Sequence, residues 1–341
     1  MQGELPAWCF VFRQLQNPEN FTEDTYVFNI QLLERNRTYM DYTEFREELF
    51  IILQKIVPKE ISIKLVEAEK LNGCIRYGIM FDRTLGLYAH TIYLEPFYRS
   101  FEKGKSLEEI AKELLKCFEE EKNEVPECMD KFHRYDLARE HIYCKLISRR
   151  ENQKLLQDTP HMPFLDFAIV AYFEVNSTEV YKGSILIKDK YLMDWGITAE
   201  EFLVNALEHT RKDKGVTFIS MEEVLADFYS SNELQIDREF HSKMYVLTNK
   251  EKYLGAVLIC FPEIMTGIAQ MLEDDFYLLP ASIHEWIIIP ENAVSDRMHL
   301  LSVVRNINCY EVLEEEVLSN DIYLYSQKSQ ENHFTCISDV D

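Results

Sequence analysis

The stretch FYLLPASIHEWIIIP, residues Phe276–Pro290, decides the fold of this chain. Two apolar runs, FYLL and WIIIP, flank a short polar insert, and runs of this composition are typical of buried strands. We therefore predict a central strand or hairpin of a C-terminal sheet. The insert contains Ser282 and His284, which need polar neighbours because an unpartnered buried polar group costs free energy. Backbone groups or Asp166 are the neighbours we expect.

The chain before this stretch predicts a compact N-terminal α-β-β-β-α unit. Asp41 and Glu44 form a capping pair ahead of an apolar helical face that ends near Val57-Pro58. Asn72-Gly73 is a strong hairpin signal between the first two strands. Ser106 with Glu109 begins a second helix. The three strands predicted between these helices are Ile61–Ala68, Cys74–Phe81 and Leu87–Leu94.

The remainder predicts a larger C-terminal mixed-sheet α+β unit, because strands and helices interleave there and two hairpins are visible. Capping boxes at Thr198/Glu201 and Ser220/Glu223 mark two helix starts, and Ala256–Phe261 is predicted as a strand. The predicted layout is an N-terminal extension (1–38), the N-terminal α+β unit (39–124), a linker or short helices (125–140), the C-terminal α+β domain (141–326) and a polar tail (327–341).

Charge and composition restrict the functional class. The 341 residues carry a formal net charge of -23, which repels phosphate backbones and argues against nucleic-acid binding by a basic face. No apolar run approaches the ~18 residues of a membrane span, and no signal peptide is visible at the start. The eight cysteines form no C-x-x-C, and several lie in apolar runs, so we expect a reducing cytoplasm.

The motifs of common cofactor and metal sites are missing. The sequence has no G-x-G-x-x-G, no P-loop and no G-x-S-x-G, so no cofactor is predicted. His284-Glu285 lacks the second histidine of a zincin helix, so no metal site is predicted.

Three polar residues in apolar surroundings are the catalytic candidates. Ser282 would be the nucleophile, His284 the base and Asp166 the orienting group. Side chains at i and i+2 of a strand stand ~7 Å apart, too far for a direct hydrogen bond. Buried serine and histidine bonded to nearby backbone are the commoner case.

A second set of polar residues supplies candidates for ligand binding. They are His90, Glu95, His161, Asn249 and Glu285. With His284, the histidines and Glu95 among them could form a metal site if the domains close on each other. Histidines that cap strand ends are the simpler explanation.

Several separated motifs resemble one known family. They are HTIYLEPFY (90–98), GKSLEEI (104–110), NQKLLQDTPHMPFLDFAIV (152–170), MDWGITAEEF (193–202), MYVLTNKEKYLGA (244–256) and LLPASIHEWIIIP (278–290). In this order they resemble domain-of-unknown-function family 5688, uncharacterised proteins of anaerobic gut bacteria, over roughly residues 40–326. The resemblance implies no reaction, cofactor or partner. The candidate polar residues lie within these motifs, so they are the positions at which we expect any functional site.

These observations favour a cytoplasmic, non-enzymatic protein that binds another protein or a small ligand. One alternative is a hydrolase or metal-dependent enzyme that uses the buried Asp, Ser, His and Glu positions. Another is an acidic nucleic-acid mimic, which requires one continuous stripe of negative charge. The oligomeric state stays open.

Overall fold

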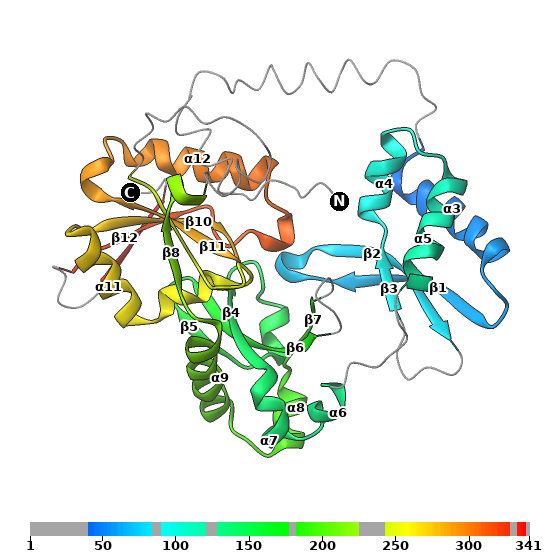
Figure 1. The fold of residues 1–341 in the computed structure, drawn as a ribbon, viewed down its shortest axis with the longest axis horizontal. Helices are drawn as coiled ribbons and strands as arrows, with labels where there is room; N and C mark the ends of the chain where they lie inside the picture. Colours follow the sequence, from blue (N-terminus) through cyan, green and yellow to red (C-terminus); the bar gives the residue numbers. More distant parts are fainter. Residues whose placement is uncertain are drawn as a thin grey trace. The chain divides into compact units, whose positions relative to one another are not determined.

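A computed structural model describes residues 40–83, 90–120, 128–176, 182–224, 243–327 and 333–338. The predicted N-terminal extension, 1–38, and the side chain of His90 lie outside what it describes. The described residues divide into two compact units, an N-terminal unit up to Met129 and a C-terminal unit from Asp130. The α+β class is confirmed in both (Figure 1).

The N-terminal unit has the predicted α-β-β-β-α order. Its elements are α3 (Tyr42–Ile56), β1 (Ile61–Glu69), η2 (Leu71–Gly73), β2 (Ile75–Arg83), β3 (His90–Tyr93), α4 (Glu95–Glu102) and α5 (Leu107–Glu120). The strands pair antiparallel in the order β1-β2-β3. Asn72 and Gly73 adopt the left-handed conformation, with φ of 59° and 72°, in the connection of β1 to β2.

Local hydrogen bonds explain where these helices begin. The Asp41 carboxylate accepts from the backbone N–H of Thr43 and Glu44, and the Glu44 carboxylate accepts from the N–H of Asp41. Ser106 and Glu109 form the same reciprocal pair ahead of α5. Both helices then place one apolar face in a shared core, whose buried members are Phe45, Leu49, Leu53, Ile79, Phe81, Leu94, Ile110, Ala111, Leu114 and Phe118.

The C-terminal unit is built on two antiparallel sheets among its described strands. The six-stranded sheet has the order β13-β12-β10-β11-β9-β8, and β10 and β11 form its central hairpin. Its strands are β8 (Thr217–Ser220), β9 (Tyr245–Thr248), β10 (Phe276–Ser282), β11 (Glu285–Pro290), β12 (Ile322–Tyr325) and β13 (Phe334–Ile337). The predicted central hairpin is therefore confirmed. β13 lies within the stretch predicted as a polar tail.

The four-stranded sheet is centred on β6 (Phe167–Asn176). β4 (Ile142–Ser148) pairs with one edge of β6, and β5 (His161–Phe164) and β7 (Lys182–Leu186) pair with successive parts of β6. Every strand pair described in this unit is antiparallel, so the prediction of a mixed sheet is wrong.

The helical elements of the C-terminal unit cover these sheets. They are α6 (Met129–Phe132, at the boundary), α7 (Tyr135–Ala138), η3 (Arg139–His141), η4 (Leu155–Asp158), α8 (Asp189–Trp195), α9 (Ala199–Lys214), η5 (Gly255–Cys260), α11 (Pro262–Leu272), η6 (Glu291–Ala293), α12 (Arg297–Tyr310) and η7 (Glu314–Glu316). α12 packs on β10 and α9 packs on β4 (Figure 1). In the described part of the chain, no helix combines the length and apolar character of a membrane span.

One strand prediction is wrong. Residues 255–260 form the 3-10 helix η5, not a strand. Leu254 has a left-handed backbone, with φ of 55°, which turns the chain immediately before this apolar run. A short apolar run fits a buried strand or a buried helical segment equally well, and the turn decides between them.

The hairpin Phe276–Pro290 holds the C-terminal unit together. All residues of β10 and β11 are buried. One face joins Tyr277, Leu279 and Ile287 to the apolar side of α12. On the four-stranded sheet, Phe167 contacts the rings of Trp286 and Tyr323, with centroids 5.9 and 5.3 Å apart. The hairpin thus contacts both α12 and the four-stranded sheet.

Candidate functional site

The tip of the β10–β11 hairpin brings together four of the predicted polar positions: Asn249, Ser282, His284 and Glu285. A register shift between Pro280 and Ser282 breaks the regular alternation of side chains at this point. His284 therefore lies in the turn, between the two strands, and does not share a strand face with Ser282. We call these four residues, with the loop 249–254, the hairpin tip.

His284 anchors the loop that faces it. Its Nδ1 accepts a hydrogen bond of 2.9 Å from the Leu254 N–H. Its Nε2 lies 3.3 Å from a Glu316 carboxylate oxygen. Its backbone carbonyl accepts from the Thr248 hydroxyl at 2.8 Å. The imidazole thus has both nitrogens engaged in holding chain segments in place.

Asn249 shapes the same loop from inside. Its Oδ1 accepts from the N–H of Glu251 and Tyr253, and its Nδ2 donates to the Tyr253 carbonyl at 2.6 Å. These bonds hold a turn in which Lys252 and Leu254 have positive φ. Next to the turn, a Cβ added at Gly255 would lie 2.6 Å from the Asn249 nitrogen and 2.8 Å from the His284 oxygen. Only glycine lets the backbones approach this closely.

Ser282 is also used locally. Its hydroxyl accepts from the backbone N–H of His284 at 3.0 Å. This satisfies the prediction that backbone groups are its neighbours. In the described part of the chain, neither its hydroxyl nor the His284 ring bonds to Asp166.

Asp166 instead belongs to the contact between the two sheets of the C-terminal unit. It lies in the turn between β5 and β6, after Leu165 with φ of 54°. Both carboxylate oxygens accept from the Tyr323 hydroxyl at 2.8 Å. Burial raises the pKa of the Asp166 carboxyl, and the Tyr323 hydrogen bond opposes that rise. The geometry therefore gives the proposed Ser-His-Asp arrangement no support.

Glu285 is the unusual group of the hairpin tip. Its side chain is 7% exposed, and no hydrogen bond to its carboxylate occurs among the described residues. Burial raises its pKa to about 7, while the charges of His284 and Lys252 pull it down and Glu316 pushes it up. A buried carboxyl that titrates near neutrality can act as an acid or base.

The other predicted ligand-binding positions lie elsewhere. Glu95 begins α4 in the N-terminal unit, where its Oε1 accepts from the Tyr77 N–H at 2.9 Å. His161 is exposed on β5, and its Nδ1 bonds to the Thr159 carbonyl at 2.8 Å. Only the backbone of His90 is described, opposite Phe81. Among the described residues, no three His, Cys, Asp or Glu side chains are placed to hold a metal ion.

A buried ionic network joins α9 to the loop of the hairpin tip. The Lys214 ammonium is 3.0 Å from the Glu174 carboxylate and 2.7 Å from that of Glu251. It also lies 4.0 Å from the centre of the Tyr143 ring. The Tyr143 hydroxyl donates to the Asp213 carboxylate at 2.8 Å, and burial raises the Tyr143 pKa. The network fixes the position of Glu251 and so of the loop.

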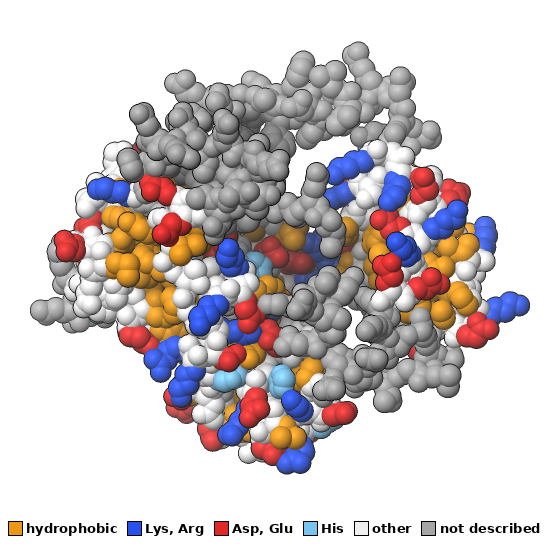
Figure 2. Space-filling model, in the orientation of Figure 1, with side chains coloured by type: hydrophobic (Ala, Val, Ile, Leu, Met, Phe, Trp, Pro, Cys, Tyr) orange, Lys and Arg blue, Asp and Glu red, His pale blue; other side chains and the backbone are white. Residues whose placement is uncertain are grey.

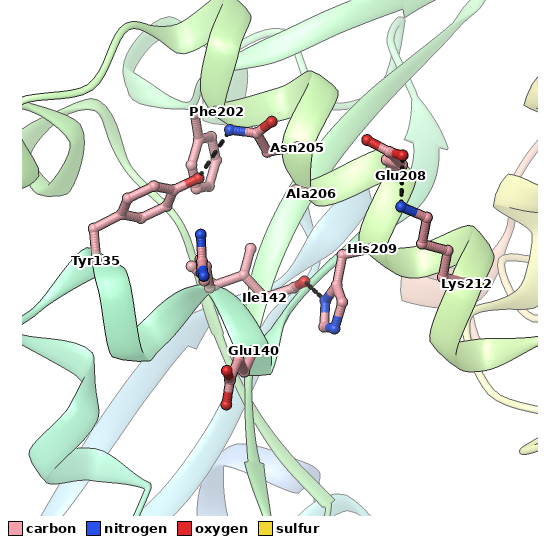
Figure 3. A pocket seen from close by; sticks show the side chains of 10 residues that line it. Tyr135, Glu140, Ile142, Phe202, Asn205, Ala206, Glu208, His209 and Lys212 are labelled. Carbon is pink, nitrogen blue, oxygen red and sulfur yellow. Dashed lines mark hydrogen bonds and ion pairs between the residues drawn. The ribbon is translucent and has the colours of Figure 1, made fainter.

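An open pocket on the surface of the C-terminal unit contains no predicted site residue. We call it the α9 pocket (Figure 3). Its volume is about 290 Å³, and its walls are Tyr135, Arg139, Glu140, Ile142, Phe202, Asn205, Ala206, Glu208, His209 and Lys212. Six of these come from one face of α9, at the spacing of successive turns. The sequence shows this spacing, but it does not show which part of the helix face other elements leave exposed to solvent.

The charges of the α9 pocket are only partly paired. Lys212 and Glu208 form an ion pair at 2.6 Å along α9, and the Asn205 amide lies 3.4 Å from the Tyr135 hydroxyl (Figure 3). Arg139 and Glu140 have no hydrogen bond or ion pair through their side chains within the described residues. His209 Nδ1 bonds to the Ile142 carbonyl at 2.9 Å, which leaves Nε2 as an acceptor.

The family comparison places these features in a known group. The model of a family of unknown function (DUF5688) matches residues 42–327. The chain belongs to this family. The match covers the described elements from α3 to β12 and both candidate sites, the hairpin tip and the α9 pocket. No curated protein and no solved structure matches the chain significantly.

The surface charges of this family member are mixed where they can be seen. On the face shown in Figure 2, Lys and Arg side chains alternate with Asp and Glu side chains over the described parts of each unit. A nucleic-acid mimic requires one continuous acidic stripe, and this face does not show one.

Proposed function

We propose that this DUF5688 protein is a non-enzymatic binding module of the cytoplasm and that the α9 pocket holds a small ligand. One observation carries the proposal. The hydroxyl and imidazole groups that catalysis would need are engaged in bonds that shape the hairpin tip. In the α9 pocket, by contrast, the side chains of Arg139 and Glu140 make no hydrogen bond or ion pair with the described residues. Ligand sites typically combine apolar walls with a few such polar groups.

The cytoplasmic location is part of this proposal. It is supported by Cys144 and Cys260, which carry free thiols within the C-terminal unit. Burial raises the pKa of Cys144 to about 12, which keeps its thiol protonated and unreactive. Such thiols are the usual form in a reducing compartment.

Two substitutions on neighbouring residues of α9 test the ligand site. Asn205→Trp fills the α9 pocket from an exposed position, whereas Val204→Trp, at a residue 52% exposed, leaves the pocket open. Each protein is dialysed against a small-molecule extract of the native host, and the retained compounds are identified by mass spectrometry. We expect a compound held by the wild type and by Val204→Trp but lost from Asn205→Trp. Retention of no compound, or equal retention by all three, would overturn the proposal.

A protein ligand is the other form of the same proposal. Pull-down from a native host lysate with the same three proteins tests it. A partner that is lost only with Asn205→Trp identifies the α9 pocket as its docking point. Repeated failure to recover a partner leaves the small-ligand form alone.

Acid–base catalysis at Glu285 is a second candidate function. It is favoured by the raised pKa of this buried carboxyl beside His284. An activity screen separates the two candidates. Turnover that is lost in Glu285→Gln but kept in Asn205→Trp would favour the enzyme, and the binding proposal would fail.

A further inference from the structure

We propose that the α9 pocket binds a free α-amino acid with an apolar side chain. This inference rests on the proposed function, because it names the ligand class of the same pocket. Three features of the described walls carry it: the size of the pocket, its balance of charge and the character of its surface.

The size of the pocket sets the class of ligand. A volume of about 290 Å³ lies at the lower limit of the ~300–1,000 Å³ that drug-sized ligands occupy. A folded peptide element is too large for it. A single small metabolite fits.

The balance of charge points to a zwitterion. The whole chain has a net charge of -23, yet the pocket walls hold two basic side chains, Arg139 and Lys212, and two acidic ones, Glu140 and Glu208. Lys212 and Glu208 neutralise each other. One guanidinium and one carboxylate then remain for the ligand. A ligand with a single carboxylate and a single ammonium complements them.

The two remaining groups suit the two ends of an α-amino acid. A guanidinium presents paired N–H donors that match a carboxylate, so Arg139 would take the α-carboxylate. Glu140 lies on the opposite side of the opening from Asn205 (Figure 3) and would accept from the α-ammonium. The free Nε2 of His209 is a second acceptor for it. A polyphosphate would meet only one unpaired cation here.

The remaining walls suit an apolar side chain. The half-buried ring of Tyr135 closes one side of the opening and supplies its apolar surface (Figure 3). The Tyr135 ring lies 6.1 Å from that of Phe202, which is fully buried, so this surface is held in place. Burying a few apolar groups there adds affinity that a fully polar ligand would not gain.

Calorimetric titration of the full chain with four defined compounds tests the inference. The compounds are L-phenylalanine, L-leucine, 2-phenylethylamine, which lacks the carboxylate, and 3-phenylpropionate, which lacks the ammonium. We expect saturable binding of at least one of the amino acids. Each truncated analogue should bind at least about tenfold more weakly, because a charged hydrogen bond is lost. Analogues that bind as tightly as L-phenylalanine would overturn the zwitterion assignment.

Substitutions at the two charged groups give the sharper test. Arg139→Gln should weaken L-phenylalanine binding about tenfold and leave 2-phenylethylamine unchanged, since that compound has no carboxylate. Glu140→Gln should weaken L-phenylalanine equally and leave 3-phenylpropionate unchanged. The matched controls are Arg150→Gln and Glu151→Gln, an exposed adjacent Arg-Glu pair away from the pocket walls, which should change nothing.

The outcomes separate this inference from the proposed function. If no amino acid binds but an extract compound is retained in the Asn205-dependent manner described above, the ligand class is wrong and the binding function stands. If neither binds, both fail. If the control substitutions weaken binding as much as Arg139→Gln, the amino acid binds elsewhere and this assignment is overturned.

Discussion

Glu285 is a carboxyl group that the fold keeps away from water at the tip of the central hairpin. Its pKa of about 7 in the folded chain is above its ordinary value of 4.5. Between about pH 4.5 and pH 7 the folded state therefore keeps a proton on Glu285 that the unfolded state has lost. Stability is greatest below this interval, falls as the pH rises through it, and is constant above it.

The substitution Glu285→Gln should remove this pH dependence. Relative to the wild type, the free energy of unfolding of the variant should rise between about pH 4.5 and pH 7, by at most about 3 kcal/mol. Urea denaturation at several pH values measures it. Glu151→Gln, at an exposed position, is the control and should follow the wild type throughout. If the curve of Glu285→Gln also runs parallel to that of the wild type, Glu285 does not titrate in this range.

The sequence allowed the polar neighbours of this hairpin to be predicted only in part. That Ser282 and His284 need partners follows from their apolar surroundings, and Ser282 does pair with backbone. The partners of His284 come from residues 30 and 32 positions away, Leu254 and Glu316. No local pattern encodes such an encounter. Asp166 was a reasonable expectation on apolar context alone, but its partner is Tyr323.

At the scale of single elements, the ammonium of Lys214 joins the last residue of α9 to Glu174 of β6. The side chain is 4% exposed and that of Glu174 6%. Removing one member of a buried pair leaves the other charge without compensation, which costs about 3–5 kcal/mol. We therefore expect Lys214→Met to lower the free energy of unfolding by about 3 kcal/mol or more.

A double-mutant cycle with Glu174→Leu separates the pair from its surroundings. Lys214→Met with Glu174→Leu should cost much less than the sum of the single changes, because no buried charge is then left alone. Lys212→Met, at a residue whose side chain is 63% exposed in the same helix, should cost less than about 1 kcal/mol. Chemical denaturation of the variants measures all these changes. Additive effects in the cycle would show that Lys214 and Glu174 act independently.

The starts of helices could be predicted where a capping pair of residues close in the sequence marks them. The capping pairs at Asp41, Ser106 and Ser220 form both expected bonds, and at Thr198 the hydroxyl accepts from the Glu201 N–H. The run at 256–261 was mispredicted because its conformation depends on the close contact of Gly255 with the His284 carbonyl. The α9 pocket was missed for a related reason. Its helix face has ordinary amphipathic spacing, and only the placement of η3 shows which part stays open.

At the scale of the whole molecule, the N-terminal unit has a core of its own. All the buried members of that core lie between Phe45 and Phe118. A segment with a separate core is expected to fold without the rest of the chain. Residues 40–120 expressed alone should therefore unfold in one cooperative transition, as circular dichroism would record.

Phe81→Ala is the matched test of that core. Phe81 is fully buried and stacks on Phe118 at a centroid distance of 4.4 Å. Its truncation should lower the free energy of unfolding of the fragment by about 3–5 kcal/mol. Gradual, non-cooperative melting of the unmodified fragment would show that this unit depends on the other.

The α+β class followed from the sequence because hairpin turns, capping pairs and apolar periods are local signals. Strand order did not follow. β10 lies between β11, which is next in the chain, and β12, which begins at Ile322. Pairing between distant segments depends on how the whole core packs, and periodicity within each segment does not record it.

The place of β10 between β11 and β12 has a consequence for synthesis. During translation the hairpin leaves the ribosome well before β12. It also precedes Glu316, whose carbonyl accepts from the Ile283 N–H. Until then one side of β10, an apolar strand, has unpaired backbone groups. Exposed edges of this kind recruit strands of other chains. A chain that stops soon after Pro290 is thus prone to aggregation, because the segment that contains β12 is what protects this edge of β10 in the folded protein.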